Sequence, residues 1–119
     1  MKITRINNEK SMKVVELKNI FAYVIGDKHE VTIFDINQQE NYAIDVISQD
    51  GNCIIVQYMD GIEENRRIKE FKQVIEATIR QSSYNENSHR VVFYNRCNGS
   101  FTIPQEFTID NEKIVVYCK

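Results

Sequence analysis

The stretch from Asp60 to Gln81 constrains the fold most, because it is the only long segment with a clear helical period. At about 100° per residue, its apolar side chains fall within one arc of roughly 140°; they are Ile68, Phe71, Val74, Ile75, Thr78 and Ile79. Asp60 is placed as an N-cap, and Glu63 follows three residues later in the capping-box position. The pattern predicts one amphipathic helix over about residues 61–81, long enough at roughly 30 Å to cross a small sheet.

The segment Val14–Ile25 fits two structures. On a helical wheel its apolar residues also share one arc, which favours a helix. Residues 20–25 are dense in β-branched and aromatic side chains, however, and they run into the turn signal Gly26-Asp27-Lys28. We predict a strand over 20–25, and the sequence leaves residues 14–19 open between helix and strand.

Most of the remaining chain has the composition of strands. The expected strands are Glu30–Ile36, Tyr42–Ser48, Cys53–Met59, Arg90–Arg96, Phe101–Ile109 with a break at Pro104, and Lys113–Cys118, after a short edge strand or ordered lead-in over residues 1–13. Asp50-Gly51 is a hairpin signal, and a two-residue loop there would place Ile47 opposite Ile54. Both faces of that hairpin are apolar, so the sheet is expected to be covered on both sides or curled.

These elements predict a single α+β domain over residues 1–119. Its sheet would be mostly antiparallel, with about six or seven strands, open or curled, and the long helix packed on it. The longest apolar run, Ile20–Ile25, is far shorter than the roughly 20 residues of a membrane span. The first residues lack the apolar core and cleavage site of a signal peptide, so we expect a cytoplasmic protein.

The sequence offers little catalytic chemistry. Its four glycines all fall at predicted turns or at the helix start, which leaves none for a phosphate-binding loop. His29 and His89 are sixty residues apart, and no C-x-x-C pair accompanies them. The three cysteines are widely spaced and odd in number, so free thiols are expected, and whether any is functional stays open. We therefore predict no catalytic residue, no metal and no cofactor, and keep a small enzyme of unknown type as an alternative.

Charge is the feature that points to a function. Residues 27–64 hold nine Asp and Glu against one lysine. Such a block predicts a negative surface that binds a basic protein surface. The candidate binding residues are Asp35, Glu40, Tyr42, Asp45 and Asp50. Small acidic α+β proteins include phage inhibitors of host nucleic-acid machinery, so by size and charge alone we expect a phage or mobile-element inhibitor, of open oligomeric state.

A second binding class is single-stranded nucleic acid. The strand Arg90–Arg96 interleaves Phe93 and Tyr94 with basic residues, and the outer face of the predicted helix carries Arg66, Lys69 and Arg80. The strand lacks the glycines of a typical RNA-binding motif. The acidic block would also repel phosphates, so we rank this alternative below protein binding.

Overall fold

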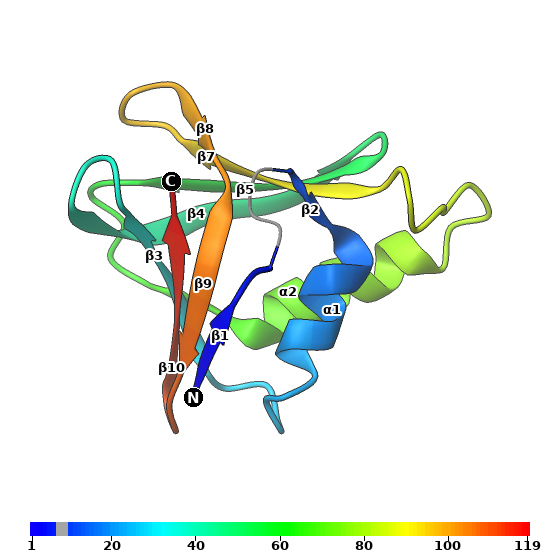
Figure 1. Cartoon of the computed structure of the whole chain (residues 1–119), viewed down its shortest axis with the longest axis horizontal. Coiled ribbons are helices and arrows are strands. Elements are labelled where there is room, and N and C mark those ends of the chain that lie inside the picture. The colour runs from blue at the N-terminus through cyan, green and yellow to red at the C-terminus, as the bar shows by residue number, and fades with distance from the viewer. Residues whose placement is uncertain (7–9) are drawn as a thin grey trace.

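A computed structural model describes residues 1–6 and 10–119 of the chain and shows two short helices on one large mixed sheet (Figure 1). The helices are α1 (Val14–Phe21) and α2 (Ile68–Ile79). The strands are β1 (Lys2–Thr4), β2 (Met12–Lys13), β3 (Glu30–Asp35), β4 (Glu40–Asp50), β5 (Cys53–Met59), β6 (Arg66–Arg67), β7 (Arg90–Asn95), β8 (Ser100–Thr102), β9 (Pro104–Ile109) and β10 (Lys113–Cys118). Part of the predicted lead-in, residues 7–9, lies outside the described residues.

The prediction of one long helix over 61–81 is wrong. Helix α2 begins only at Ile68, after the N-cap Arg67, and the backbone N–H of Arg67 donates to the Glu70 carboxylate at 3.2 Å. Asp60 is therefore not the N-cap, and Gly61 takes a left-handed turn at φ 80°. Residues Arg66–Arg67 instead form β6, which pairs with β3. The physical reason is that the apolar stripe starts at Ile68, so the polar residues before it have no helical face to bury.

The predicted strand over 20–25 is also wrong, because helix α1 runs through residues 14–19, which the sequence leaves open, and ends at Phe21, and residues 22–25 form the turn after it. Helix α1 buries Val14, Leu17, Ile20 and Phe21, which are spaced along one helical face. The Phe21 ring meets Phe71 of α2 edge-to-face at 5.3 Å between ring centroids and Phe107 of β9 at 6.2 Å. Burial against these rings outweighs the local strand preference of the segment.

The sheet is mixed, which corrects the prediction of six or seven mostly antiparallel strands. Its ten strands run in the order β1-β9-β10-β3-β4-β5-β7-β2, with β6 on β3 and β8 on β7. Two neighbouring pairs are parallel, β10 with β3 and β5 with β7. Both pairs join strands that are far apart in sequence, and α2 lies in the connection between β5 and β7. Sequence signals for tight turns reveal only the antiparallel hairpins.

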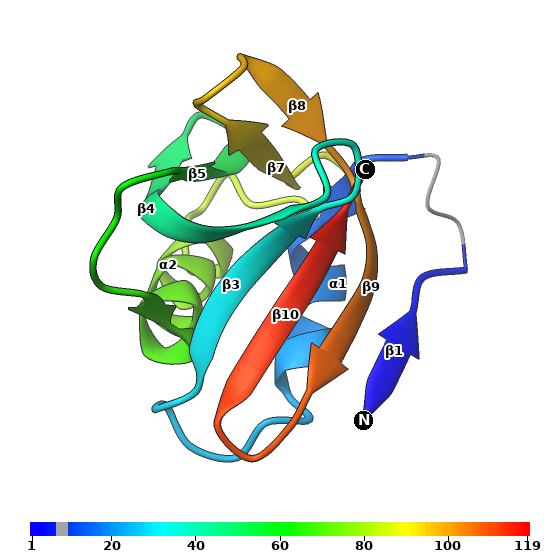
Figure 2. The ribbon, with the colours of Figure 1, turned by 90° about the vertical axis from the view of Figure 1, so that its left-hand side faces the viewer.

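The strands form a circuit that is closed by the covalent chain between β8 and β9, which do not pair with each other. Strand β8 pairs with β7 and strand β9 pairs with β10, and only Ile103 separates β8 from β9. Ile103 also exchanges two backbone hydrogen bonds with Lys119. The circuit therefore runs from β3 through β4, β5, β7, β8, β9 and β10 back to β3, with helix α1 and helix α2 behind the strands β3, β10 and β9 in Figure 2.

The β4–β5 hairpin forms where Asp50-Gly51 predicts it, but in a different register. Asp50 pairs with Cys53, so the loop residues are Gly51 and Asn52, and Ile47 lies opposite Val56 rather than Ile54. The register also shifts between Ile44 and Val46, which is a β-bulge at Asp45. This bulge brings Ile44 and Ile47 to the same buried side, an arrangement that strict alternation along the strand does not predict.

Candidate functional site

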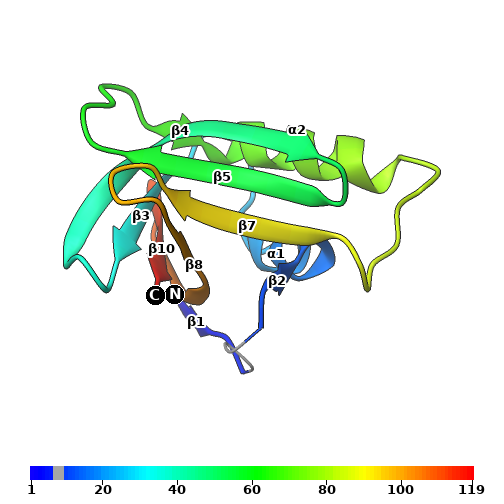
Figure 3. The same cartoon turned by 90° about the horizontal axis from the view of Figure 1, so that it is seen from above.

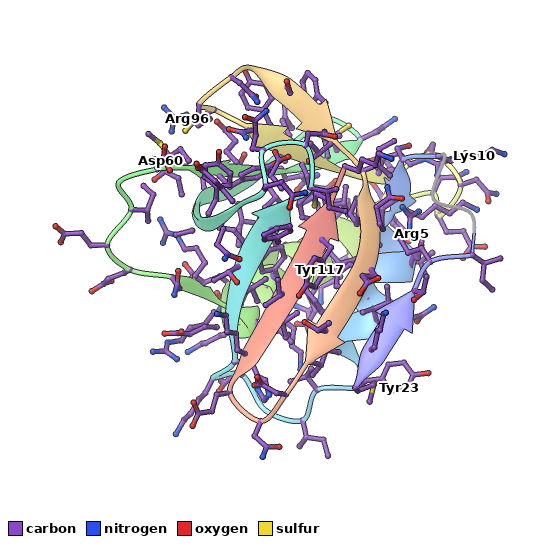
Figure 4. The ribbon with its side chains drawn as sticks, turned by 60° about the vertical axis from the view of Figure 1, so that its left-hand side comes forward. Arg5, Lys10, Tyr23, Asp60, Arg96 and Tyr117 are labelled. Carbon is purple, nitrogen blue, oxygen red and sulfur yellow. The ribbon has the colours of Figure 1, made fainter. Side chains whose placement is uncertain are left out.

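Three loops meet at one end of the molecule, on the left of Figure 1. We call this end the acidic end and define it as residues 36–40, 60–65 and 96–99. It carries four exposed carboxylates, those of Glu40, Asp60, Glu63 and Glu64. Two of the loops are linked directly, because the Asp60 backbone N–H donates to the Cys97 thiol sulfur at 3.3 Å. The Arg96 N–H also donates to the carbonyl of Tyr58, near the end of β5, at 2.9 Å. Figure 4 shows Asp60 and Arg96 close together on this side.

A buried polar network lies beneath the acidic end, centred on Asp35. The Asp35 side chain is 1% exposed. Its Oδ2 accepts a hydrogen bond from the Tyr58 hydroxyl at 2.8 Å and one from the Asn95 amide at 3.0 Å. The Tyr58 hydroxyl also lies 2.9 Å from Thr102 Oγ1. Burial raises the pKa of Tyr58 far above its ordinary value, so the hydroxyl stays protonated and donates to Asp35.

This network fixes the conformation of the loops above it. Asp35 Oδ1 accepts the backbone N–H groups of Asn37 and Gln38 at 3.0 and 3.2 Å, which shapes the β3–β4 turn. Asn95 Oδ1 accepts the N–H of Cys97 at 2.9 Å, which shapes the β7–β8 turn. Asp35 thus positions two of the three loops, and a buried side chain of this kind supports a binding surface from below without touching a partner.

The predicted binding residues do not all share one place. Glu40 is exposed at the acidic end, and Tyr42 is buried just beneath it. Burial raises the pKa of Tyr42, and the negative charges of Glu40 and Asp60 raise it further. The Asp45 carboxylate is paired with Arg96. Asp50 is the last residue of strand β4 and Glu40 the first, so ten residues and roughly 30 Å separate them along the strand.

Sequence reasoning places part of this end wrongly. Asp60, Glu63 and Glu64 fall within the predicted acidic block, but the helix predicted over 61–81 puts them at its start, whereas they belong to an exposed loop. Asn95 was missed altogether, although the sequence holds a usable signal for it. The side chains of β7 that face the core are Val91, Phe93 and Asn95, so the last of them is polar. Strand β3 has the same pattern, because its last core-facing residue is Asp35. Two such endings predict a shared buried polar contact.

The basic residues considered for nucleic acid are largely engaged within the fold. The Arg66 guanidinium donates twice to the Asp45 carbonyl, at 3.0 and 2.6 Å, and pairs with Glu70. Arg90 donates to the carbonyls of Ser11 and Asn87. Arg80 pairs with Glu76, four residues before it. The two ion pairs offset positive charge on the α2 face, and the carbonyl contacts of Arg90 occupy N–H groups that could otherwise bind a phosphate.

No group of three His, Cys, Asp or Glu side chains within residues 1–6 and 10–119 has an arrangement that could hold a metal ion. His29 Nε2 lies 2.8 Å from the Asp110 carbonyl, and the buried His89 ring packs on Tyr84 at 5.0 Å between centroids. Both histidines therefore have structural contacts at sites separate from the acidic end. In the same described part of the chain, no helix combines the length and the apolar content needed to cross a membrane.

The cysteines are expected to differ sharply in reactivity. Burial raises the pKa of the Cys118 thiol well above its ordinary value, so the unreactive protonated form persists at pH 8. Cys97 is exposed. A thiol-specific alkylating reagent at pH 8 should therefore label Cys97 quickly and Cys118 only after unfolding, as read by mass spectrometry of the labelled peptides. Equal labelling rates for the two thiols in the folded protein would contradict the burial of Cys118.

Comparison of the chain with protein-family models, with curated proteins and with solved structures finds no match.

Proposed function

We propose that this protein is a non-enzymatic binding module that contacts a basic protein surface through the acidic end. The observation that supports the proposal most is the gathering of Glu40, Asp60, Glu63 and Glu64 on neighbouring loops. The arginines beside them already have carboxylate partners, because Arg96 pairs with Asp45 and Arg66 pairs with Glu70. The net field of this end is therefore negative and would attract a positively charged partner.

Two loops of the acidic end are also preorganised for binding. The loops that carry Glu40 and Arg96 are held by the hydrogen bonds of Asp35 and Asn95, so little conformational entropy would be lost when a partner binds. Charged loops on a fixed framework favour fast, salt-sensitive association with a partner of opposite charge.

The partner class that we favour is a protein with a basic nucleic-acid-binding groove, and the role is that of a phage or mobile-element inhibitor of host nucleic-acid machinery. Carboxylates of the acidic end would occupy positions that phosphates take in such a groove. Direct binding of single-stranded nucleic acid is a weaker candidate, because Arg66, Arg80 and Arg90 already have partners within the protein.

Charge reversal tests the proposal. The variant E40K/E63K/E64K changes three exposed side chains of the acidic end, and E76K/E86K/E112K makes the same change in net charge elsewhere on the surface. A partner captured from a lysate of the source cells and identified by mass spectrometry should bind the first variant at least about tenfold more weakly than the unchanged protein. The second variant should bind within about twofold of the unchanged protein.

Two results would contradict the proposal. Undiminished affinity of E40K/E63K/E64K, with the fold intact by circular dichroism, would exclude the acidic end from the interface. An equal loss in both variants would show that only net charge matters. Stronger binding to a single-stranded oligonucleotide by the unchanged protein than by a K69E variant would favour the nucleic-acid alternative, because Lys69 is an exposed cation of the α2 face.

A further inference from the structure

The outer face of strands β4, β5, β7 and β8 is apolar and uncovered. In Figure 3 these strands lie in front, and both helices lie behind them. Alternation along β5 turns Ile54, Val56 and Tyr58 toward the core, so Ile55 points outward, paired with Val92 of β7. Tyr94 and Phe101 pair on the same side. Within residues 10–119, the centre of this outer face carries no charged side chain, and the charged residues Asp50, Arg90 and Arg96 lie at its ends. The centre consists of Val46, Ser48, Ile55, Gln57, Val92, Tyr94 and Phe101.

Phe101 protrudes from this face. Its side chain is 69% exposed, although its ring packs on Tyr94 at 4.9 Å between centroids. The other large exposed apolar residues are Met1, Ile6, Tyr23 and Ile25, which lie in the N-terminal segment or in the loop after α1. Phe101 is therefore the one among them that stands on a sheet face with further apolar side chains around it.

A hollow of about 400 Å³ lies directly beside Phe101. It forms because β2 pairs with β7 at Arg90 and Val91 while β8 pairs from Phe93 onward, so the two partner strands separate at Val92. The lining is apolar for the most part and consists of Ser11, Met12, Val91, Val92, Phe101, Thr102, Ile103 and Pro104. A protruding aromatic ring and an apolar hollow thus share one surface patch.

We propose that this patch binds a second copy of the chain about a two-fold axis, with Phe101 of each copy entering the hollow of the other. A two-fold contact requires that knob and hole lie in the same patch, since each copy presents the same surface. The uncharged centre of the face adds no repulsion between identical copies. The acidic end does not favour such a contact, because two copies that met there would place the four carboxylates of one copy next to the four of the other.

The size of the face sets the expected affinity. Strand β8 has only three residues, so residues 46–50 of β4 together with β5, β7 and β8 cover roughly 330 Å² per copy, at about 3.3 Å per residue and 4.8 Å between strands. This area is well below the roughly 800 Å² per partner of a stable complex. We therefore expect a weak dimer that forms over the micromolar to millimolar range and leaves the acidic end free.

Analytical ultracentrifugation of the full chain from about 1 μM to about 1 mM tests this dimer. The unchanged protein should shift from monomer to dimer over that range, and Phe101→Asp should raise the dissociation constant at least about tenfold. Ile25→Asp is the matched control, because Ile25 is 96% exposed in the loop after α1. The Ile25→Asp variant should dimerise like the unchanged protein. Circular dichroism of both variants verifies the fold.

Each other outcome overturns the proposal. A protein that stays monomeric at about 1 mM has no such self-contact, and if its Phe101→Asp variant then loses binding to a captured protein, the face serves a different partner. Dimerisation unaffected by Phe101→Asp, or abolished by Ile25→Asp, places the contact elsewhere on the molecule. Because neither variant alters Glu40 or the loops at 60–65 and 96–99, the result is independent of the function proposed for the acidic end.

Discussion

Replacing Asp35 by alanine is expected to lower the free energy of unfolding by about 3–5 kcal/mol. The change removes a buried acceptor and leaves the Tyr58 hydroxyl, the Asn95 amide and two backbone N–H groups of the β3–β4 turn without their partner. Each buried donor that loses its acceptor costs about 1–3 kcal/mol, and partial entry of water offsets part of the sum. Urea denaturation followed by circular dichroism measures the loss.

Asp45→Ala is the matched control for this substitution. The Asp45 side chain also carries a charge and has a partner, Arg96, but 26% of it and 42% of the Arg96 side chain are exposed. A solvent-screened pair of this kind contributes less than about 1 kcal/mol. If Asp35→Ala were no more destabilising than Asp45→Ala, the buried network would not hold the loops as we infer.

Replacing Phe21 by alanine is expected to cost about 3–5 kcal/mol, through lost burial and the cavity that remains. Phe21 is 1% exposed and lies between Phe71 of α2 and Phe107 of β9, so its ring joins both helices to the sheet. The measurement is the same urea titration, with the slope of the transition compared between variants to verify that the unfolding stays two-state.

The comparison residue for Phe21 is Tyr23, two positions later and 64% exposed. Tyr23→Ala should change the unfolding free energy by no more than about 0.5 kcal/mol. Similar losses at Tyr23 and Phe21 would instead favour the strand over 20–25 that the sequence pattern predicts, because side chains two positions apart in a strand face the same side.

Local patterns predicted the strands well. The bounds of Cys53–Met59 and Lys113–Cys118 are those expected from alternation and flanking turns. Pro104 marks an irregularity, as expected, because β8 ends before it and the β9–β10 register shifts beside it. These features depend on near neighbours in the chain, which a single sequence displays directly.

The errors in the predicted elements arise where contacts between residues far apart in the sequence determine the local structure. Arg66–Arg67 has helix-forming residues, yet it pairs with β3, more than thirty residues earlier. The segment from Val14 forms a helix because Phe21 packs on Phe71 and Phe107. The parallel pairing of β10 with β3 joins strands about eighty residues apart in the sequence and leaves no local signal. Intrinsic helix and strand propensities predict local structure poorly where burial in the tertiary fold opposes them.

The candidate site combines a sequence pattern with placements that depend on the fold. Charge counting along the chain finds the acidic segment, and Asp35 is one of the candidate binding residues within it. Its role differs from the predicted one, since it is buried and positions the loops around Glu40 and Cys97. Asp50 belongs to the same charged segment but lies at the far end of β4, because a long hairpin separates residues that are close in sequence.

The most direct test of the binding surface is hydrogen–deuterium exchange of the full chain, measured by mass spectrometry with and without the captured partner. We predict slower exchange on binding in peptides that cover residues 36–40, 60–65 and 96–99, and unchanged exchange in α2 and in residues 100–102. Protection confined to α2 or to strand β7, with exchange at the acidic end unaltered, would contradict the account.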